Sequence, residues 1–198
     1  MIESLFTYIE KHADMILNQD EKDLISLTFK HKKILKRRFF LEEGNIGHWI
    51  GFVIKGALRQ YSTNKAGQQY TTRFAIENWW IGDYESFANL TPANHSIEAI
   101  EDSDLLLIDA EQAKMLKSQI PAYLKMQDLL DKRGLIAYHA RTQASISLSA
   151  EEKYLDLLER YPEFFRRFTR NMIASYLGMT PETLSRVRTQ HLNNNKNR

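Results

Sequence analysis

The sequence predicts an α+β protein in which an N-terminal antiparallel β-roll, resembling a jelly roll, precedes a long helix and a C-terminal all-α helix-turn-helix domain. Three observations predict this order. Short runs rich in β-branched and aromatic residues, separated by turn signals, fill residues 34–108. An uninterrupted helical stretch follows Pro121. Residues 170–189 contain the small and turn-forming residues that two tightly packed helices require.

The composition is that of an ordinary globular protein and excludes several kinds of site. The chain has 198 residues, of which 43% are hydrophobic and 26% charged. It has no cysteine, which excludes disulfides, thiolate metal sites, cysteine-ligated iron–sulfur clusters and cysteine catalysis. The N-terminal segment alternates apolar and charged residues, without an apolar run that could serve as a signal peptide or membrane span. We therefore expect a cytoplasmic protein with no membrane partner.

The charge is distributed unevenly along the chain. The formal net charge is +2, but the segment from Phe164 to the end has seven basic residues and one acidic residue. That segment carries +6 and leaves −4 for the rest of the chain. A basic module appended to an acidic body is typical of proteins that bind a polyanion such as DNA. An ordinary solvated helical surface would explain the charge alone equally well.

The β-rich region divides into six predicted strands. Turn signals at 42–45, 55–56, 64–67 and 82–83 separate them. Strands at this spacing predict a small antiparallel barrel or sandwich. The first thirty or so residues are predicted to be helical, with Asp20 as a helix cap. The predicted strands are Arg38–Leu41, Trp49–Ile54, Leu58–Tyr61, Tyr70–Phe74, Ile97–Ile100 and Leu105–Ile108.

A long helix is predicted from Ala122 to Ser147, after a short helix that Pro121 ends. It would be about 39 Å long. Its narrow apolar stripe predicts pairing with the same helix of a second copy, although packing on the body of its own chain is the alternative. The residues predicted at the dimer interface are Met126, Leu129, Leu130, Ala137 and Ala140.

A predicted capping box marks the next boundary, with Ser149 as the cap and Glu152 bonding back to it. The sequence is thus divided into a β-roll effector-type domain with flanking helices (1–121), a dimerisation helix (122–147) and a helix-turn-helix domain (148–198).

The segment from Arg170 to Thr189 is the most informative part of the sequence. Ala174 falls where two helices approach closely, and Gly178 falls at the turn. Thr180 can cap the second helix, and Pro181 suits its first position. An ordinary helical hairpin also places glycine at its turn, but this combination favours DNA binding. The inner faces are predicted to hold Ile173, Leu177, Leu184 and Val187.

Helix geometry assigns roles within this segment. The N-terminal half of the second helix would enter the major groove. Glu182, Ser185 and Arg186 are predicted to contact bases there. For Glu182, a favourable interaction with the helix dipole is the alternative. The predicted contacts with the DNA backbone are Arg170, Thr180, Thr183 and Arg188.

With these parts in place, the sequence resembles the CRP/FNR family of bacterial transcription regulators over nearly its whole length. The segments FLEEGN, FVIKGALR and FAIENWWIGD resemble that family's β-roll, and MTPETLSRVR resembles its recognition helix. The resemblance implies a homodimer that binds a palindromic operator on double-stranded DNA, with RNA polymerase as a further candidate partner. Pro181 replaces an arginine of the family, so we expect a different operator from that of the cyclic-AMP receptor.

The resemblance also implies where an effector would bind. Cyclic-AMP-binding members have a Gly-Glu pair and an Arg-Ser pair, whereas this sequence has Gly82-Asp83 and His95-Ser96. We therefore do not expect cyclic AMP as a ligand, and the missing cysteines exclude the iron–sulfur cluster of the oxygen-sensing branch. A regulator without any effector is the alternative to an unidentified small effector. The candidate effector pocket, whose aromatic members could instead be core residues, comprises Trp80, Gly82, Asp83, Tyr84, His95 and Ser96.

A β-roll enzyme and a module without DNA binding are the two alternatives to a DNA-binding regulator. A metal-dependent β-roll enzyme needs clustered histidines and carboxylates, but the six histidines are scattered without metal-binding spacing. We therefore expect no metal site, no catalytic residues and no enzymatic activity. The second alternative is an effector-binding or interaction module whose helix-turn-helix does not bind DNA.

Overall fold

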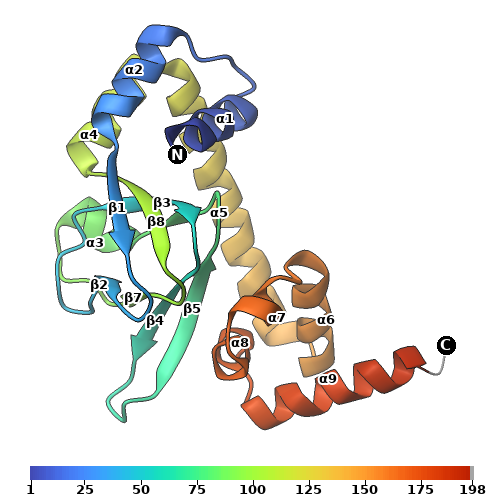
Figure 1. Ribbon diagram of the computed structural model, residues 1–198. Coiled ribbons are helices and arrows are strands. Elements are labelled where there is room, and N and C mark those ends of the chain that lie inside the picture. Colours follow the sequence, from blue (N-terminus) through green and yellow to red (C-terminus); the bar gives the residue numbers. More distant parts are fainter. Residues whose placement is uncertain (197–198) are drawn as a thin grey trace. The chain divides into compact units, whose positions relative to one another are not determined.

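The computed structural model describes residues 1–196 (Figure 1). The chain forms two compact units. Unit 1 contains Met1–Ser62 and Arg73–Gly134, and unit 2 contains Thr63–Thr72 and the chain from Leu135 onward. The fold is α+β, with antiparallel sheets in the N-terminal region followed by a long helix and C-terminal helices, as the sequence predicted.

Unit 1 begins with two helices, α1 (Ile2–Ala13) and α2 (Gln19–Thr28). The predicted cap at Asp20 is wrong, because Asn18 caps α2 instead. The Asn18 side chain accepts the Glu21 N–H at 2.9 Å, and the Glu21 carboxylate accepts the Asn18 N–H at 2.9 Å. This reciprocal pair satisfies two backbone donors at the start of the helix.

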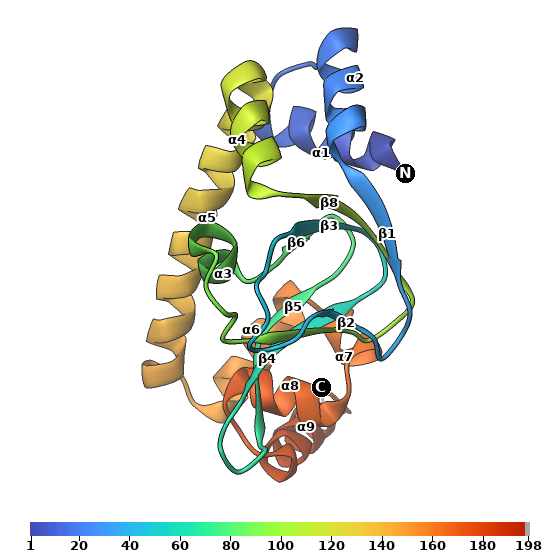
Figure 2. The same cartoon turned by 90° about the vertical axis from the view of Figure 1, so that its left-hand side faces the viewer.

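The β-roll consists of two four-stranded sheets, with strand orders β1-β8-β3-β6 and β2-β7-β4-β5 (Figure 2). The six predicted strands are all present, with ends shifted by at most two residues, whereas β1 and β6 were not predicted. The strands are β1 (Lys30–Ile34), β2 (Phe39–Leu41), β3 (Ile50–Lys55), β4 (Leu58–Thr63), β5 (Gln69–Ala75), β6 (Trp80–Ile81), β7 (Ser96–Ala99) and β8 (Ser103–Ile108).

Strand β8 shows how the sequence fills two hydrophobic cores in unit 1. Successive side chains of a strand point to opposite faces. Leu106 and Ile108 accordingly lie in the core that includes residues of α1, α4 and the start of α5, while Leu105 and Leu107 lie in a second core lined by strands of both sheets. A continuous apolar run in the sequence therefore produces a strand that is buried on both faces.

Three helices complete this part of the chain: α3 (Tyr84–Asn89), α4 (Ala110–Gln119) and α5 (Pro121–Ser147). Helix α5 confirms the predicted long helix, although Pro121 is its first residue. Its first turns bury Ala122, Tyr123 and Met126 in the core of unit 1. Residues 131–143 are all exposed.

Unit 2 contains the C-terminal helices α6 (Ala150–Arg160), α7 (Phe164–Arg167), α8 (Arg170–Leu177) and α9 (Pro181–Lys196). The predicted capping box is confirmed. The Glu152 N–H donates to Ser149 Oγ at 3.3 Å, and the Ser149 N–H donates to the Glu152 carboxylate at 2.8 Å. The core of these helices is made by buried Tyr154, Leu157, Phe164, Phe168, Ile173, Ala174, Leu184 and Val187.

The hairpin tip, residues 63–72, belongs to unit 2 because helices of that unit hydrogen-bond it. Ser175 Oγ donates to the Gln69 carbonyl at 3.1 Å and accepts the Thr71 N–H at 2.8 Å. The Arg141 guanidinium donates to the carbonyls of Thr71, Thr72 and Tyr176, and its Cζ lies 4.3 Å from the centre of the Tyr176 ring. One serine and one arginine thus join α5, α8 and the hairpin tip.

Candidate nucleic-acid interface

The turn between α8 and α9 has the geometry that the sequence predicted. Thr169 caps α8 by accepting the Met172 N–H at 3.4 Å. Gly178 ends the helix in the left-handed conformation, with φ 67° and ψ 36°. Its N–H donates to the carbonyls of Ala174 and Ser175, so the last turn of α8 has partners for its free acceptors.

The start of α9 is also built as predicted. Thr180 Oγ1 accepts the Thr183 N–H at 3.2 Å, and the Thr180 carbonyl accepts the Leu184 N–H at 3.0 Å. Pro181 is the first helical residue, a position where a missing N–H costs nothing.

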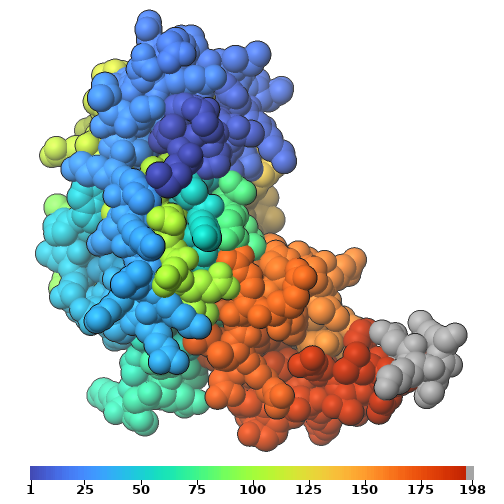
Figure 3. All heavy atoms as spheres, viewed as in Figure 1, coloured from blue at the N-terminus to red at the C-terminus, as the bar shows by residue number. Residues whose placement is uncertain are grey.

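The two helices bury one face each and leave a polar face of α9 open. Ala174 is fully buried where α8 meets α9, while Leu177, predicted on the inner face, is only half-buried. The exposed residues of α9 include Glu182, Arg186 and Thr189. At 3.6 residues per turn these fall on the side opposite Leu184 and Val187, so that face of α9 is open to solvent. Figure 3 shows the atoms of α9, in red, at the surface.

The predicted base contacts differ in exposure. Arg186 is exposed, and Ser185 is half-buried beside it. Glu182 is exposed in the first turn of α9. Hydrogen bonds from its own backbone N–H and from the Thr180 side chain lower the pKa of this carboxyl below its ordinary value. Glu182 therefore remains ionised at the N-terminus of α9, where a negative charge is favourable.

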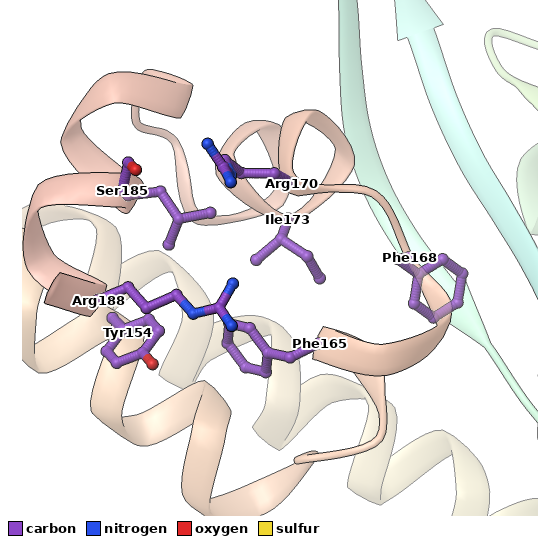
Figure 4. Close-up of a pocket in the computed structure, with 8 residues that line it drawn as sticks. Tyr154, Phe165, Phe168, Arg170, Ile173, Ser185 and Arg188 are labelled. Atoms are coloured by element: carbon purple, nitrogen blue, oxygen red, sulfur yellow. The ribbon is translucent and has the colours of Figure 1, made fainter. Parts of the chain in front are cut away.

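The predicted backbone contacts fall into two groups. Thr180 and Thr183 lie at the start of α9, exposed and half-buried respectively. Arg170 and Arg188 are exposed and line a hollow of about 50 Å³ (Figure 4). The predicted motif does not reveal this hollow, because the aromatic residues that line it, Tyr154, Phe165 and Phe168, precede the motif in the sequence. It is lined by Tyr154, Phe165, Phe168, Arg170, Ile173, Leu184, Ser185 and Arg188.

The dimer-interface candidates on α5 do not share one environment. Met126 is fully buried in the core of unit 1 and is not available to a partner, which corrects that part of the prediction. Leu129 and Leu130 are half-buried, and Ala137 and Ala140 are exposed. Five large apolar side chains that were not among these candidates are exposed on the same helix, namely Leu124, Leu135, Ile136, Tyr138 and Ile146.

The effector candidates in unit 1 are partly core and partly paired with one another. Trp80 belongs to the hydrophobic core, with its ring centre 5.1 Å from that of Phe52. Tyr84 is exposed, with Arg73 over its ring, and the Gly82 carbonyl accepts from the Gln60 side chain at 3.5 Å. A hollow of about 40 Å³ in unit 1 is lined by none of the candidates, but by Phe40, Leu41, Ile46, Gly47, His48 and Trp49.

His95 and Ser96, the pair that the family resemblance assigns to a nucleotide phosphate, both have partners within unit 1. His95 Nδ1 lies 3.1 Å from the carboxylate of Asp83, which is buried and caps α3 by accepting the Ser86 N–H. Ser96 Oγ accepts the Glu43 N–H at 3.0 Å. A cyclic phosphate here would compete with Asp83 for His95 and lie beside a like charge. These residues therefore do not fit a cyclic nucleotide.

Two features are absent from residues 1–196, a metal-binding cluster and a membrane-spanning helix. No three histidine, cysteine, aspartate or glutamate side chains in that range are grouped so that they could hold a metal ion. None of the helices described is both long enough and apolar enough to cross a membrane.

Comparison with known proteins finds one matching domain and similar bacterial regulators. The sequence model of the cyclic nucleotide-binding domain matches residues 31–119. Over 187 residues the chain is 24% identical to the transcriptional activator protein Anr of Pseudomonas aeruginosa, covering 89% of this chain and 76% of Anr.

Solved structures share the fold. FixK2 from Bradyrhizobium japonicum superposes with a TM-score of 0.71 at 17% identity, covering 85% of this chain and 86% of FixK2. A CRP/FNR-family transcriptional regulator from Thermus thermophilus superposes with a TM-score of 0.64 at 16% identity, covering 83% of this chain and 87% of that one. The chain therefore contains a segment that matches the cyclic nucleotide-binding domain, is similar in sequence to a bacterial transcription activator, and shares the fold of regulators of the CRP/FNR family.

Proposed function

We propose that this protein is a transcription regulator that binds double-stranded DNA as a homodimer and recognises a palindromic operator through α9. The observation that carries the proposal is the helix-turn-helix, with its capped second helix and open polar face. The net charge of +6 from Phe164 onward would attract the phosphate backbone.

Within the operator, Arg186 would donate two hydrogen bonds to a guanine, and Ser185 would contact a neighbouring base. Glu182 would either accept from a cytosine or only stabilise the start of α9. The backbone contacts would come from Arg170, Thr180, Thr183 and Arg188.

The dimer proposal rests on α5. Leu135, Tyr138 and Ile146 are 60%, 67% and 83% exposed. Spaced three and eight residues apart, they fall along one side of the helix. Exposed apolar side chains of this size in a row are typical of a helix that pairs with another copy. At 100° per residue, Ala137 and Ala140 fall on the other side, so the interface would use a different face from the one first predicted.

Because the cyclic nucleotide does not fit, we propose that any effector is of another chemical class or that none is required. DNA binding would place the regulator in the cytoplasm, where RNA polymerase is its further candidate partner.

The test is selection of genomic DNA fragments by the purified protein, followed by footprinting. We expect a palindromic site with half-sites about one helical turn apart. Arg186→Ala should weaken operator binding by about 1–3 kcal/mol while leaving nonspecific binding nearly unchanged. Arg38→Ala, which removes an exposed arginine of unit 1, is the control. Failure to bind any duplex in a salt-dependent manner would favour the module without DNA binding.

A further inference from the structure

The hollow in unit 2 has two arginines over an apolar floor (Figure 4). Arg170 is the first residue of α8, and Arg188 lies one turn after buried Leu184 on α9. Tyr154 and Phe165 supply aromatic rings below them, with ring centres 5.3 Å apart. Within residues 1–196, neither Arg170 nor Arg188 forms an ion pair with an acidic side chain.

Two guanidinium groups line one small hollow, and within residues 1–196 neither is paired with an acidic side chain. An anion bound between them would form a charge-assisted contact with each. Because a guanidinium presents its N–H groups as a planar fork, it matches the oxygens of a phosphate. Ser185 lines the same hollow and supplies a hydroxyl donor.

Size and position together identify the anion. Sites for drug-sized ligands have volumes of roughly 300–1,000 Å³, whereas this hollow of about 50 Å³ suits a single phosphate group. Ser185 both lines the hollow and precedes Arg186, a residue of the open face of α9. A strand whose bases contact Arg186 would therefore carry its backbone past the hollow.

We propose that this hollow is a clamp for one phosphodiester group of the operator, held jointly by Arg170 and Arg188. The inference rests on the proposed DNA binding and adds that the two arginines, on different helices, share one phosphate. The clamp would fix the position of α8 and α9 on the backbone, so that Arg186 meets the same base pair each time.

The test uses the full-length protein and its footprinted operator. Each phosphate of a half-site is replaced, one at a time, by a neutral methylphosphonate. We expect one position at which the replacement weakens binding of the unaltered protein by about tenfold or more. Arg188→Gln and Arg170→Gln should each bind the unmodified operator more weakly, and both should lose most of their sensitivity at that same position. Arg38→Ala should keep the original profile.

One further variant and one further measurement distinguish loss of the phosphate contact from loss of packing. Arg188→Lys keeps a positive charge and should recover part of the lost affinity. Thermal melting of each variant without DNA should show that the fold is retained. If Arg188→Gln unfolds the domain, the methylphosphonate profiles of Arg170→Gln and Arg188→Lys still show whether the two arginines contact the same phosphate.

Three different results would contradict the shared clamp, and each has a different consequence. Different sensitive positions for the two arginines, or profiles unchanged in both variants, would refute the shared clamp while leaving DNA binding intact. A flat profile combined with stabilisation by inorganic phosphate that Arg188→Gln abolishes would reassign the hollow to a free anion. Absence of salt-dependent DNA binding by the unaltered protein would refute the proposed function, and the clamp with it.

Discussion

At the scale of single residues, the turn of the helix-turn-helix depends on Gly178. Its φ of 67° lies in the left-handed region, where a side chain is strained. A Cβ added there would have no atom within 4 Å. The cost of a side chain at this position is therefore backbone strain alone.

We predict that Gly178→Ala lowers the free energy of unfolding by about 1 kcal/mol. Urea denaturation followed by circular dichroism would measure it. Asparagine tolerates the left-handed conformation better than alanine, so Gly178→Asn should lose less. An alanine variant as stable as the unaltered protein would contradict this account of the turn.

The residues of this turn could be predicted because each acts on its immediate neighbours. Thr180 and Pro181 start a helix, and Gly178 ends one, through backbone geometry that a short segment determines. Tyr154 and Phe165 could not be assigned to the hollow in the same way. They lie on α6 and α7, and only packing of the whole unit brings them beneath Arg188.

At the scale of elements, helix α5 shows that sequence periodicity predicts the length of a helix but not what its apolar face contacts. The predicted length and ends were nearly correct, but Met126 was assigned to a partner chain. Periodicity shows that a helix has an apolar face without showing what covers that face. Here the Met126 face covers the core of unit 1, and a second apolar row, containing Leu135 and Ile146, is left exposed.

Strand β1 was missed for a related reason. Its sequence, KHKKI, has one buried residue and four exposed polar ones, so it has no apolar alternation. It is a strand because it pairs along its length with β8, from Lys30 opposite Leu107 to Ile34 opposite Ser103. Long-range pairing of this kind overrides local preference. Lysines on an edge strand also discourage pairing with other chains.

A carboxylate introduced on one face of α5 or on the other would show which face forms the dimer interface. Leu135→Glu should weaken self-association by about tenfold or more, because each protomer would bring a charge into the apolar contact. Ala137→Glu adds the same group on the other side of the helix and should leave the dimer intact. Sedimentation equilibrium would measure both, and the opposite order of effects would restore the face that includes Ala137 and Ala140.

At the scale of the whole molecule, buried phenols link stability to pH. Burial raises the pKa of Tyr123 well above the ordinary value, an effect that the Gln127 side chain offsets in part. Desolvation also raises the pKa of Tyr8, Tyr61, Tyr154 and Tyr161. Above the ordinary tyrosine pKa the unfolded chain loses protons that the folded chain keeps. The free energy of unfolding therefore falls as pH rises.

We predict that stability declines as pH rises above about 10 and that Tyr123→Phe reduces the decline. Urea midpoints measured from about pH 9 to about pH 11 would show this as a shallower slope for the variant. Tyr70→Phe, at an exposed tyrosine of β5, is the control and should follow the unaltered protein. An identical slope for Tyr123→Phe would show that Tyr123 does not contribute.

The hydrogen bonds of Ser175 and Arg141 to the hairpin tip limit how a protein of this fold can exchange its C-terminal helices with another. Unit 2 is not a continuous length of chain, because residues 63–72 belong to it. A recombination event that exchanged only the sequence after α5 would bring in a helix-turn-helix without the strand edge that Ser175 bonds. A recombined gene would encode a helix-turn-helix with its hydrogen bonds intact only if it also carried a matching hairpin, which is encoded more than sixty codons upstream.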